Sequence, residues 1–220
     1  MSIWHTVGQQ LQRPTGLYGR LAGNLMGIVN EKPNRLAVDA LRIGARDTVL
    51  ELGFGPGRAI EIMASRAPNG IIYGVDQSTI MLEQAKSRNR EAILEGRVCL
   101  YRARFDALPF ADASIDKILA VNVVYFWRDA ASVVKEIRRV LRPGGSLSIY
   151  ATDAATMRDW KFAGPETHRL YRAAELNEVL LQGGFDRHRV SVKCVLMPGK
   201  IKGLLATVSA PLILTNGLGR

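Results

Sequence analysis

The stretch VLELGFGPGR, residues 49–58, decides how this chain folds, because three glycines separate an apolar run from a helical pattern. Residues 48–52 are expected to form a buried strand, and a helix is expected to begin near Arg58. Each glycine removes a Cβ where the backbone must turn tightly or let a ligand approach. A strand, a glycine turn and a helix N-terminus together predict a cradle for a nucleotide-sized ligand.

The spacing of the glycines separates one kind of nucleotide ligand from another. Dinucleotide-binding loops follow the pattern G-x-G-x-x-G, whereas Gly53, Gly55 and Gly57 alternate with other residues. Pro56 lies between the last two and has no N–H group to donate to a pyrophosphate. The loop is therefore poorly suited to a diphosphate, and the sequence disfavours an NAD-dependent oxidoreductase.

The composition is that of one globular domain. The chain has 220 residues, of which 47% are hydrophobic and 23% charged, as is ordinary for a domain of this size. It has no run of eighteen apolar residues and no N-terminal signal-peptide pattern, so we expect a cytoplasmic protein without a transmembrane segment. Cys99 and Cys194 fall in apolar contexts and are expected to be buried free thiols. Too few ligands cluster to predict a metal site.

The formal net charge of +10 allows two interpretations. Basic residues are spread along the chain without a single block and without interleaved aromatic residues, which favours solvated helix faces. The alternative is a functional contact with an anionic partner, such as an anionic lipid or RNA. The sequence leaves both interpretations open.

Strand and helix patterns alternate along the chain from about residue 34. Strands are expected at 49–52, 71–75, 98–101, 115–121 and 146–150, and helices at 34–43, 58–66, 78–95, 130–141 and 172–182. This alternation predicts an α/β fold with a mostly parallel sheet and helices on both faces. Residues 189–196 and 204–209 have strand character, although the apolar tail at 203–214 is also compatible with a membrane-surface element.

Three later motifs accompany the glycine loop: GVDQS at 74–78, LPFADASID at 108–116 and RVLRPGG at 139–145. In this order the four resemble class I S-adenosylmethionine-dependent methyltransferases over roughly residues 35–150. The LPF and RPGG patterns are most similar to the small-molecule branch that includes ubiquinone/menaquinone methyltransferases. The resemblance implies S-adenosylmethionine as cofactor.

The resemblance also implies an architecture. It predicts a Rossmann-like, seven-stranded, mostly parallel sheet with a C-terminal antiparallel strand pair. Residues 1–220 are then a single methyltransferase domain. Within it we expect an N-terminal helical lid segment at 1–33, a cofactor-binding core at 34–150, and an acceptor-side connection with sheet closure at 151–220.

Cofactor-binding residues follow from the matched motifs. Asp76 ends a strand, where its carboxylate can accept hydrogen bonds from both ribose hydroxyls; its alternative role is to cap the next helix, which Ser78 can also do. Arg104 occupies the position where the family often has an acid at the adenine amino group. Either Asp106, the nearest acid, reaches the adenine instead, or backbone groups and Phe105 hold it. The cofactor-binding residues that the resemblance implies are Glu51, Gly53, Gly55, Gly57, Asp76, Gln77, Met81, Phe105, Asp106, Asn122 and Tyr18.

The acceptor side is less well defined by the sequence. Asn122 and Tyr125 stand where amino methyltransferases carry Asn-Pro-Pro-Tyr, and the absence of the prolines argues against planar amide or exocyclic amine acceptors. His168 and Tyr125 are weak candidates for catalysis, and Asp116 is expected to be structural. We expect in-line S_N2 methyl transfer to a small-molecule or lipid-like acceptor. A phospholipid or RNA methyltransferase and a non-catalytic S-adenosylmethionine-binding protein are alternatives.

Overall fold

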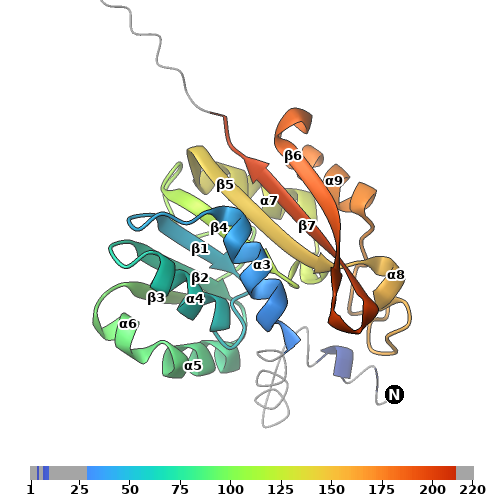
Figure 1. Cartoon of the computed structure of the whole chain (residues 1–220), viewed down its shortest axis with the longest axis horizontal. Helices are drawn as coiled ribbons and strands as arrows, with labels where there is room; N and C mark the ends of the chain where they lie inside the picture. The colour runs from blue at the N-terminus through green and yellow to red at the C-terminus, as the bar shows by residue number, and fades with distance from the viewer. Residues whose placement is uncertain (1–3, 5–6, 10–28, 212–220) are drawn as a thin grey trace, which may run out of the picture.

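A seven-stranded sheet forms the centre of the molecule (Figure 1). The computed structural model describes residues 4, 7–9 and 29–211. The strand order is β3-β2-β1-β4-β5-β7-β6; the first five strands in this order are parallel, and β7 is antiparallel to β5 and β6. This confirms the predicted fold class. The strands are β1 (Thr48–Leu52), β2 (Ile71–Asp76), β3 (Val98–Arg102), β4 (Ile115–Val121), β5 (Leu141–Thr152), β6 (Val190–Met197) and β7 (Ile201–Ser209).

Helices cover both faces of the sheet and create two apolar cores. Residues of α3, α4 and α5 bury one core, and residues of α7 and α9 bury the other. The α-helices are α3 (Glu31–Leu41), α4 (Arg58–Arg66), α5 (Thr79–Arg88), α6 (Arg90–Leu94), α7 (Ala130–Val140), α8 (Ala154–Met157) and α9 (Ala173–Gln182). Short 3-10 turns lie at Val124–Phe126, Arg187–Arg189 and Pro198–Lys200.

The helix predicted over residues 78–95 is wrong in one respect, because it divides into α5 and α6 at Asn89. The Asn89 side chain donates hydrogen bonds to the carbonyl oxygens of Gly57 and Ala85, at 3.1 and 2.9 Å. An asparagine that binds the backbone in this way competes with helix continuation. The expectation that Ser78 can cap the helix is confirmed, since its hydroxyl accepts from the Met81 N–H.

Arg139 joins two of the motifs that are far apart in the sequence. Its guanidinium donates to the carbonyl oxygens of Leu108 and Phe110, at 3.2 and 2.9 Å, and to the carboxylate of Asp112, at 2.6 Å. These bonds hold the loop between β3 and β4 against α7, where the ring of Phe110 packs 5.0 Å from that of Tyr73. Two motifs of the sequence, RVLRPGG and LPFADASID, are therefore in direct contact in the fold.

Asp116 is structural, as expected. Its carboxylate accepts a hydrogen bond from the Thr48 N–H at the start of β1 and receives both contacts from Arg142 at 2.8 Å. The Asp116 carboxylate of β4 thus joins the first residues of β1 and β5, away from the carboxyl ends where ligands bind.

The C-terminal part completes the sheet. The strands predicted at 189–196 and 204–209 are confirmed as β6 and β7, so the described part of the apolar 203–214 segment is a strand rather than a membrane-surface element. In the portion of the chain that the structure covers, no helix has the length and apolar character needed to cross a membrane.

The two cysteines contradict the prediction of buried thiols. Cys99 is partly exposed and Cys194 is exposed. The physical reason is the strand order, since β3 and β6 are the two edge strands, which neighbouring strands cover on one side only. A local apolar pattern does not reveal which strand lies at an edge.

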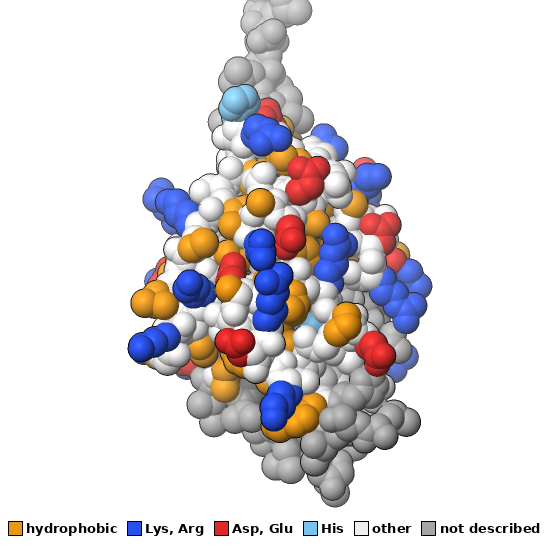
Figure 2. Space-filling view, turned by 90° about the vertical axis from the view of Figure 1, so that its right-hand side faces the viewer, with side chains coloured by type: hydrophobic (Ala, Val, Ile, Leu, Met, Phe, Trp, Pro, Cys, Tyr) orange, Lys and Arg blue, Asp and Glu red, His pale blue; other side chains and the backbone are white. Residues whose placement is uncertain are grey.

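The positive charge is dispersed over the described surface. Figure 2 shows the face that carries α8, α9 and β6, where Lys and Arg side chains alternate with acidic and apolar ones. Many arginines elsewhere are paired with carboxylates, for example Arg66 with Asp39 at 2.9 Å and Arg97 with Glu95 at 2.5 Å. This distribution is typical of solvated helix and strand surfaces.

Candidate active site

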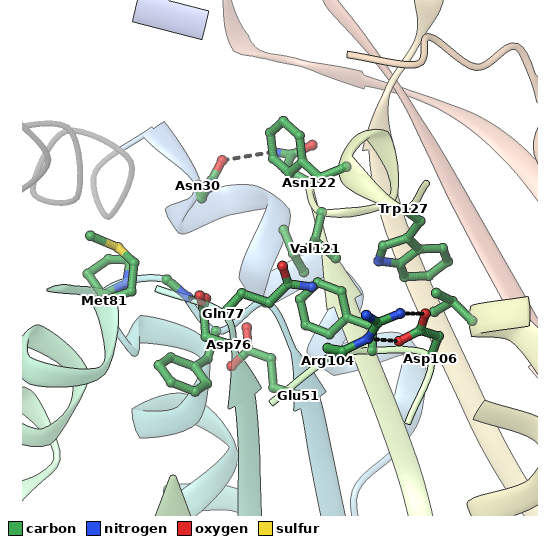
Figure 3. A pocket seen from close by; sticks show the side chains of 18 of the residues that line it. Asn30, Glu51, Asp76, Gln77, Met81, Arg104, Asp106, Val121, Asn122 and Trp127 are labelled. Carbon is green, nitrogen blue, oxygen red and sulfur yellow. Dashed lines mark hydrogen bonds and ion pairs between the residues drawn. The ribbon is translucent and has the colours of Figure 1, made fainter. Parts of the chain in front are cut away.

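A cavity of about 330 Å³ opens at the carboxyl ends of the parallel strands (Figure 3). In open α/β sheets this is the edge where ligands bind. Its walls come from the loops that follow β1, β2, β3 and β4. The sequence-predicted residues that line it are Glu51, Gly53, Gly55, Asp76, Gln77, Met81, Phe105, Asp106 and Asn122.

Two of the three glycines line this cavity, and each does so for a different reason. Gly53 has φ +72°, and a Cβ there would collide with the side chain of Val123. Gly55 has φ +50°, and a Cβ there would meet no atom within 4 Å, because the residue faces open space. Gly57 does not line the cavity: it begins α4, and a Cβ there would lie 2.8 Å from that of Ala85. The first two glycines shape the site, and the third allows α5 to pack closely.

Asp76 is held rigidly at the end of β2. One carboxylate oxygen accepts from the Gly55 N–H at 3.0 Å and the other from the Ser78 N–H at 2.8 Å. Burial raises the pKa of this carboxyl to about 6, and the two backbone donors oppose that rise. Each oxygen keeps a further lone pair, so the group can still accept hydrogen bonds from a ligand.

Glu51 lies at the end of β1 and is buried, with 2% of its surface exposed. Burial and then the neighbouring Asp76 raise the pKa of the Glu51 carboxyl well above its ordinary value. Its Oε2 atom has no hydrogen-bond partner among the described residues. A buried carboxylate oxygen without a donor is costly, and a cationic or N–H group in the cavity would remove that cost. Glu51, Gly53, Gly55 and Asp76 are here named the glycine-loop end of the cavity.

Asn122 follows β4 in the left-handed region, at φ +51°. Its side chain donates to Oδ1 of Asn30 at 2.8 Å and accepts from the hydroxyl of Tyr125 at 2.9 Å. It also accepts from the Thr152 N–H at 3.2 Å. The network ties the residue before α3 to the ends of β4 and β5, and thereby holds a strained asparagine at the cavity wall.

The two weak catalytic candidates do not line the cavity. Tyr125 is buried, which raises the pKa of its hydroxyl, and it binds Asn122 and the backbone of Thr152. Burial lowers the pKa of His168 to about 4, so its imidazole is neutral at pH 7. The His168 ring packs 4.9 Å from that of Phe126, behind the cavity wall. Tyr18 lies outside the described residues.

Several lining residues carry no sequence signal of their own. Phe126, Trp127, Arg128 and Asp129 follow β4 and line the cavity at the side away from Asp76; we name residues 126–129 the β4 end. The sequence indicated aromatic residues here without deciding between wall and core. Asn30 and Asn34 line the cavity from the start of α3, and a motif search does not detect isolated asparagines.

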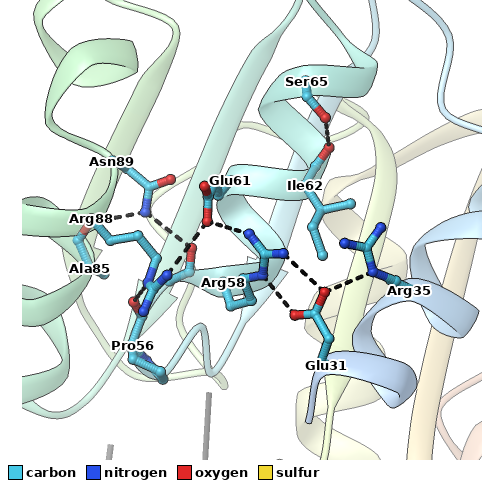
Figure 4. Close-up of polar contacts among 11 residues, drawn as sticks. Glu31, Arg35, Pro56, Arg58, Glu61, Ile62, Ser65, Ala85, Arg88 and Asn89 are labelled. Atoms are coloured by element: carbon cyan, nitrogen blue, oxygen red, sulfur yellow. Dashed lines mark hydrogen bonds and ion pairs between the residues drawn. The ribbon is translucent and has the colours of Figure 1, made fainter. Parts of the chain in front are cut away.

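Arg58 also lines the cavity, although the sequence predicted only that a helix begins there. Glu31 of α3 accepts two bonds from its guanidinium, at 2.7 and 2.9 Å, and Glu61 accepts a third at 2.7 Å (Figure 4). Hydrogen bonds from Arg58 and from Arg35 lower the pKa of Glu31 to about 2. The ion pair fixes the start of α3 against the glycine loop.

Asp106 reaches the cavity in an ion pair with Arg104, at 2.5 Å. Figure 3 shows this pair beside Trp127, across the cavity from Met81. Asp106, one of the groups expected to reach the adenine, is therefore paired with Arg104, which stands where the family often has an acid. Within the described ranges, no group of three or more His, Cys, Asp or Glu could hold a metal ion.

Fold and cavity together define a class of protein: an α/β domain with a glycine loop, a strand-end acid and a second acid for an adenosyl cofactor. The methyltransferase domain model matches residues 50–149. A methyltransferase of uncharacterised role from Bacillus subtilis, YdaC, is 32% identical over 129 residues, which cover 59% of this chain and 69% of YdaC. The chain belongs to the class I S-adenosylmethionine-dependent methyltransferases, and S-adenosylmethionine is its cofactor.

Other relatives share less of their length. Trans-aconitate 2-methyltransferase from Rhodopseudomonas palustris is 29% identical over 161 residues, which cover 70% of this chain and 59% of that protein. The matches cover 42% of the methyltransferase GfsG from Streptomyces halstedii and 31% of a 37.1 kDa transposon protein from Streptomyces fradiae. The structure of an S-adenosylmethionine-dependent methyltransferase from Aquifex aeolicus superposes with a TM-score of 0.63 at 19% identity, over 80% of this chain and 89% of that one. It supports the fold.

Proposed function

We propose that this enzyme transfers a methyl group to a small-molecule or lipid-like acceptor by in-line S_N2 displacement. The observation that carries the proposal is the glycine-loop end, where the buried Glu51 and the half-buried Asp76 flank the open space beyond Gly55. When bound, S-adenosylmethionine supplies an electrophilic methyl group on a positively charged sulfur. The carboxyl groups of Glu51 and Asp76 suit that positive charge, and two of the arginines that line the cavity, Arg58 and Arg104, are paired with acids.

Each lining residue is assigned a role in this proposal. Asp76 accepts hydrogen bonds from the ribose hydroxyls, and the unpartnered Oε2 of Glu51 accepts from the amino group. Gly55 leaves room for the cofactor to lie against the backbone. Gln77, Met81, Phe105 and Asp106 also line the cavity and would contact the adenine, and Asn122 would contact the cofactor from the end of β4.

The cavity favours catalysis by positioning. Its described lining contains no histidine, cysteine, lysine or tyrosine that could accept a proton at neutral pH. Among its acids, Asp106 is paired with Arg104, and Asp129 accepts bonds from both the backbone and hydroxyl of Ser132. Alignment of the acceptor with the methyl carbon therefore supplies the rate enhancement, and the acceptor atom is already nucleophilic.

Two observations support a small acceptor rather than a macromolecule. The cavity of about 330 Å³ is of the size that small ligands occupy, and on the face that Figure 2 shows, the cations are interspersed with acidic and apolar side chains rather than gathered in one stripe. The similarity to trans-aconitate 2-methyltransferase, whose name gives a small acceptor, supports the proposal. We propose further that residues 1–220 act as a single domain, since the strands of 34–150 and 151–211 share one sheet.

Calorimetric titration with S-adenosylmethionine and S-adenosylhomocysteine tests the cofactor site. We expect micromolar binding by the wild type and at least a hundredfold loss in the Asp76→Ala variant, because a charged acceptor of two hydrogen bonds is removed. Lys202→Ala, at the exposed start of β7, is the matched control and should bind normally. Labelled-methyl transfer over metabolite, phospholipid and RNA panels then identifies the acceptor; transfer to RNA or phospholipid alone would contradict a small-molecule acceptor.

A further inference from the structure

The β4 end of the cavity contains a cation that the rest of the site does not use. Three arginines line the cavity. Arg58 is paired with Glu31 and Glu61, and Arg104 is paired with Asp106. Arg128 makes no ion pair or hydrogen bond with any residue that the structure describes. Because a guanidinium has five N–H donors in a planar fork, an unpaired one at a cavity wall can hold an oxyanion.

The neighbouring residue supplies a second, independent donor. The Trp127 side chain is buried, with 3% of its surface exposed, and its indole N–H has no acceptor among the described residues. Buried tryptophan N–H groups usually find a partner. Figure 3 shows the indole nitrogen on the edge of the ring that faces the other lining residues. A ligand oxygen in the cavity would supply the missing acceptor.

The nearby acids bind other described groups, although Asp129 keeps its negative charge. Asp129 follows Arg128 directly, but its two carboxylate oxygens accept from the N–H and the hydroxyl of Ser132 at 3.1 and 2.6 Å, which caps α7. Asp106 is held by Arg104. The exposed Arg128 guanidinium and the buried Trp127 N–H, which no described acid engages, are donors of the kind that a carboxylate with its charge spread over two oxygens accepts from.

We propose that Trp127 and Arg128 form a subsite for the carboxylate of the acceptor, so that the substrate class is a small organic acid. The inference rests on the proposed function and adds the acceptor's chemistry to it. Both residues are assigned to acceptor binding and specificity; neither takes part in bond making. Figure 3 shows Trp127 on the other side of the cavity from Met81, and Arg128 follows it directly in the chain, so acceptor recognition is separated from cofactor recognition.

Binding of simple probes to the protein saturated with S-adenosylhomocysteine tests the subsite. The probes are benzoate, benzamide and phenyl phosphate, which share a ring and differ in the charged group. We expect benzoate to bind at least tenfold more tightly than benzamide, and more tightly than phenyl phosphate. Trp127→Phe and Arg128→Gln should each weaken benzoate binding about tenfold, because each removes a donor to a charged group.

Matched controls come from the same chain. Trp160→Phe removes an indole that does not line the cavity, and Arg187→Gln removes an exposed cation that makes no ion pair with the described residues. Both should bind benzoate like the wild type. All four variants should keep the wild-type affinity for S-adenosylhomocysteine, which shows that each is folded and that the proposed cofactor site is intact.

Three results would overturn the subsite. One is equal binding of benzoate and benzamide by the wild type. Another is unchanged benzoate affinity in both Trp127→Phe and Arg128→Gln. The third is a Trp127→Phe variant that loses affinity for S-adenosylhomocysteine, since the indole would then face the cofactor. By contrast, a wild type that fails to bind S-adenosylhomocysteine at all would contradict the proposed function itself.

Discussion

The two ends of the cavity carry polar groups of opposite kinds. At the glycine-loop end the key groups are acids, Asp76 held by backbone N–H groups and the buried Glu51 with one unpartnered oxygen, and the pKa values of both are raised. At the β4 end they are donors, the indole of Trp127 and the guanidinium of Arg128, on a short turn between β4 and α7. One end suits a cationic sulfonium cofactor, whereas the other suits an anionic acceptor.

The difference also concerns how each end is built. The glycine-loop end depends on backbone geometry, because Gly53 and Gly55 adopt positive φ and Asp76 bridges β2 to the loop. The β4 end depends on side-chain packing and on a buried polar network around Tyr125 and Asn122. A backbone-built site tolerates few substitutions, while a side-chain-built site can change its ligand without a change of fold.

The largest effect is expected from Gly53→Ala. Its φ of +72° and the collision with Val123 should lower the free energy of unfolding by about 3 kcal/mol. Gly55→Ala is the matched variant: open space surrounds it, so only the strain of positive φ, about 1 kcal/mol, is expected. Urea unfolding measures both, and calorimetry should show that Gly55→Ala weakens S-adenosylmethionine binding about tenfold. Equal stability losses would contradict this division of roles.

The second-largest effect is expected in the pH dependence of cofactor binding, which tests the acids of the glycine-loop end. Ionised Asp76 is the form that accepts hydrogen bonds, so affinity for S-adenosylmethionine should fall about tenfold per pH unit below pH 6. The stability of the free protein should change in the opposite sense. Because folding raises the pKa of Asp76, its contribution to stability is fully present below pH 4 and is lost as the pH rises through 6, by about 2–3 kcal/mol.

Titrations and urea unfolding between pH 4.5 and 8 check both trends. Glu51 shifts in the same direction and strengthens the stability trend. An Asp76→Asn variant should lose most of the pH dependence of binding. If the wild-type affinity stays constant from pH 7 to pH 5, Asp76 does not act as the ionised acceptor that the site requires.

The smallest effect is expected from Tyr125→Phe at the β4 side. The substitution removes a buried hydroxyl that donates to Asn122 and accepts from the Thr152 N–H. We expect a loss of about 1–2 kcal/mol in the free energy of unfolding and a change of less than threefold in S-adenosylmethionine affinity. The rate of methyl transfer, measured once the acceptor is known, should fall only as far as the loss of stability lowers the amount of folded protein. A large loss of transfer in a stable variant would instead restore Tyr125 as a catalytic residue.

The sequence predicted which residues line the cavity best where those residues directly follow a strand. Glu51, Gly53, Gly55 and Asp76 follow strands directly, and the carboxyl ends of adjacent parallel strands meet at one edge of the sheet, so their residues come together in the cavity. Gly57 shows the limit of this reasoning. It continues the same alternating pattern, yet it packs against α5, because a pattern does not say which side of a turn faces a helix.

The features that the sequence did not predict depend on contacts between residues far apart in the chain. His168 follows an irregular segment that the sequence suggested as an acceptor wall, but it packs behind Phe126 as a neutral ring. Cys99 and Cys194 lie in apolar runs and are nevertheless exposed to different degrees, because their strands form the sheet edges. Neither outcome can be derived from neighbours in the sequence.

The sequence by itself determined the fold class, the family and the cofactor, since these depend on strand–turn–helix patterns and glycine spacing within short windows. The tertiary structure alone decided which side chains share the cavity and which of them lack partners. Arg58 and Arg128 are both arginines beside turns in the sequence; only folding brings Glu31 of α3 to the first and no carboxylate of the described residues to the second. Ion pairing depends on distance in space, and the order of residues along the chain does not specify that distance.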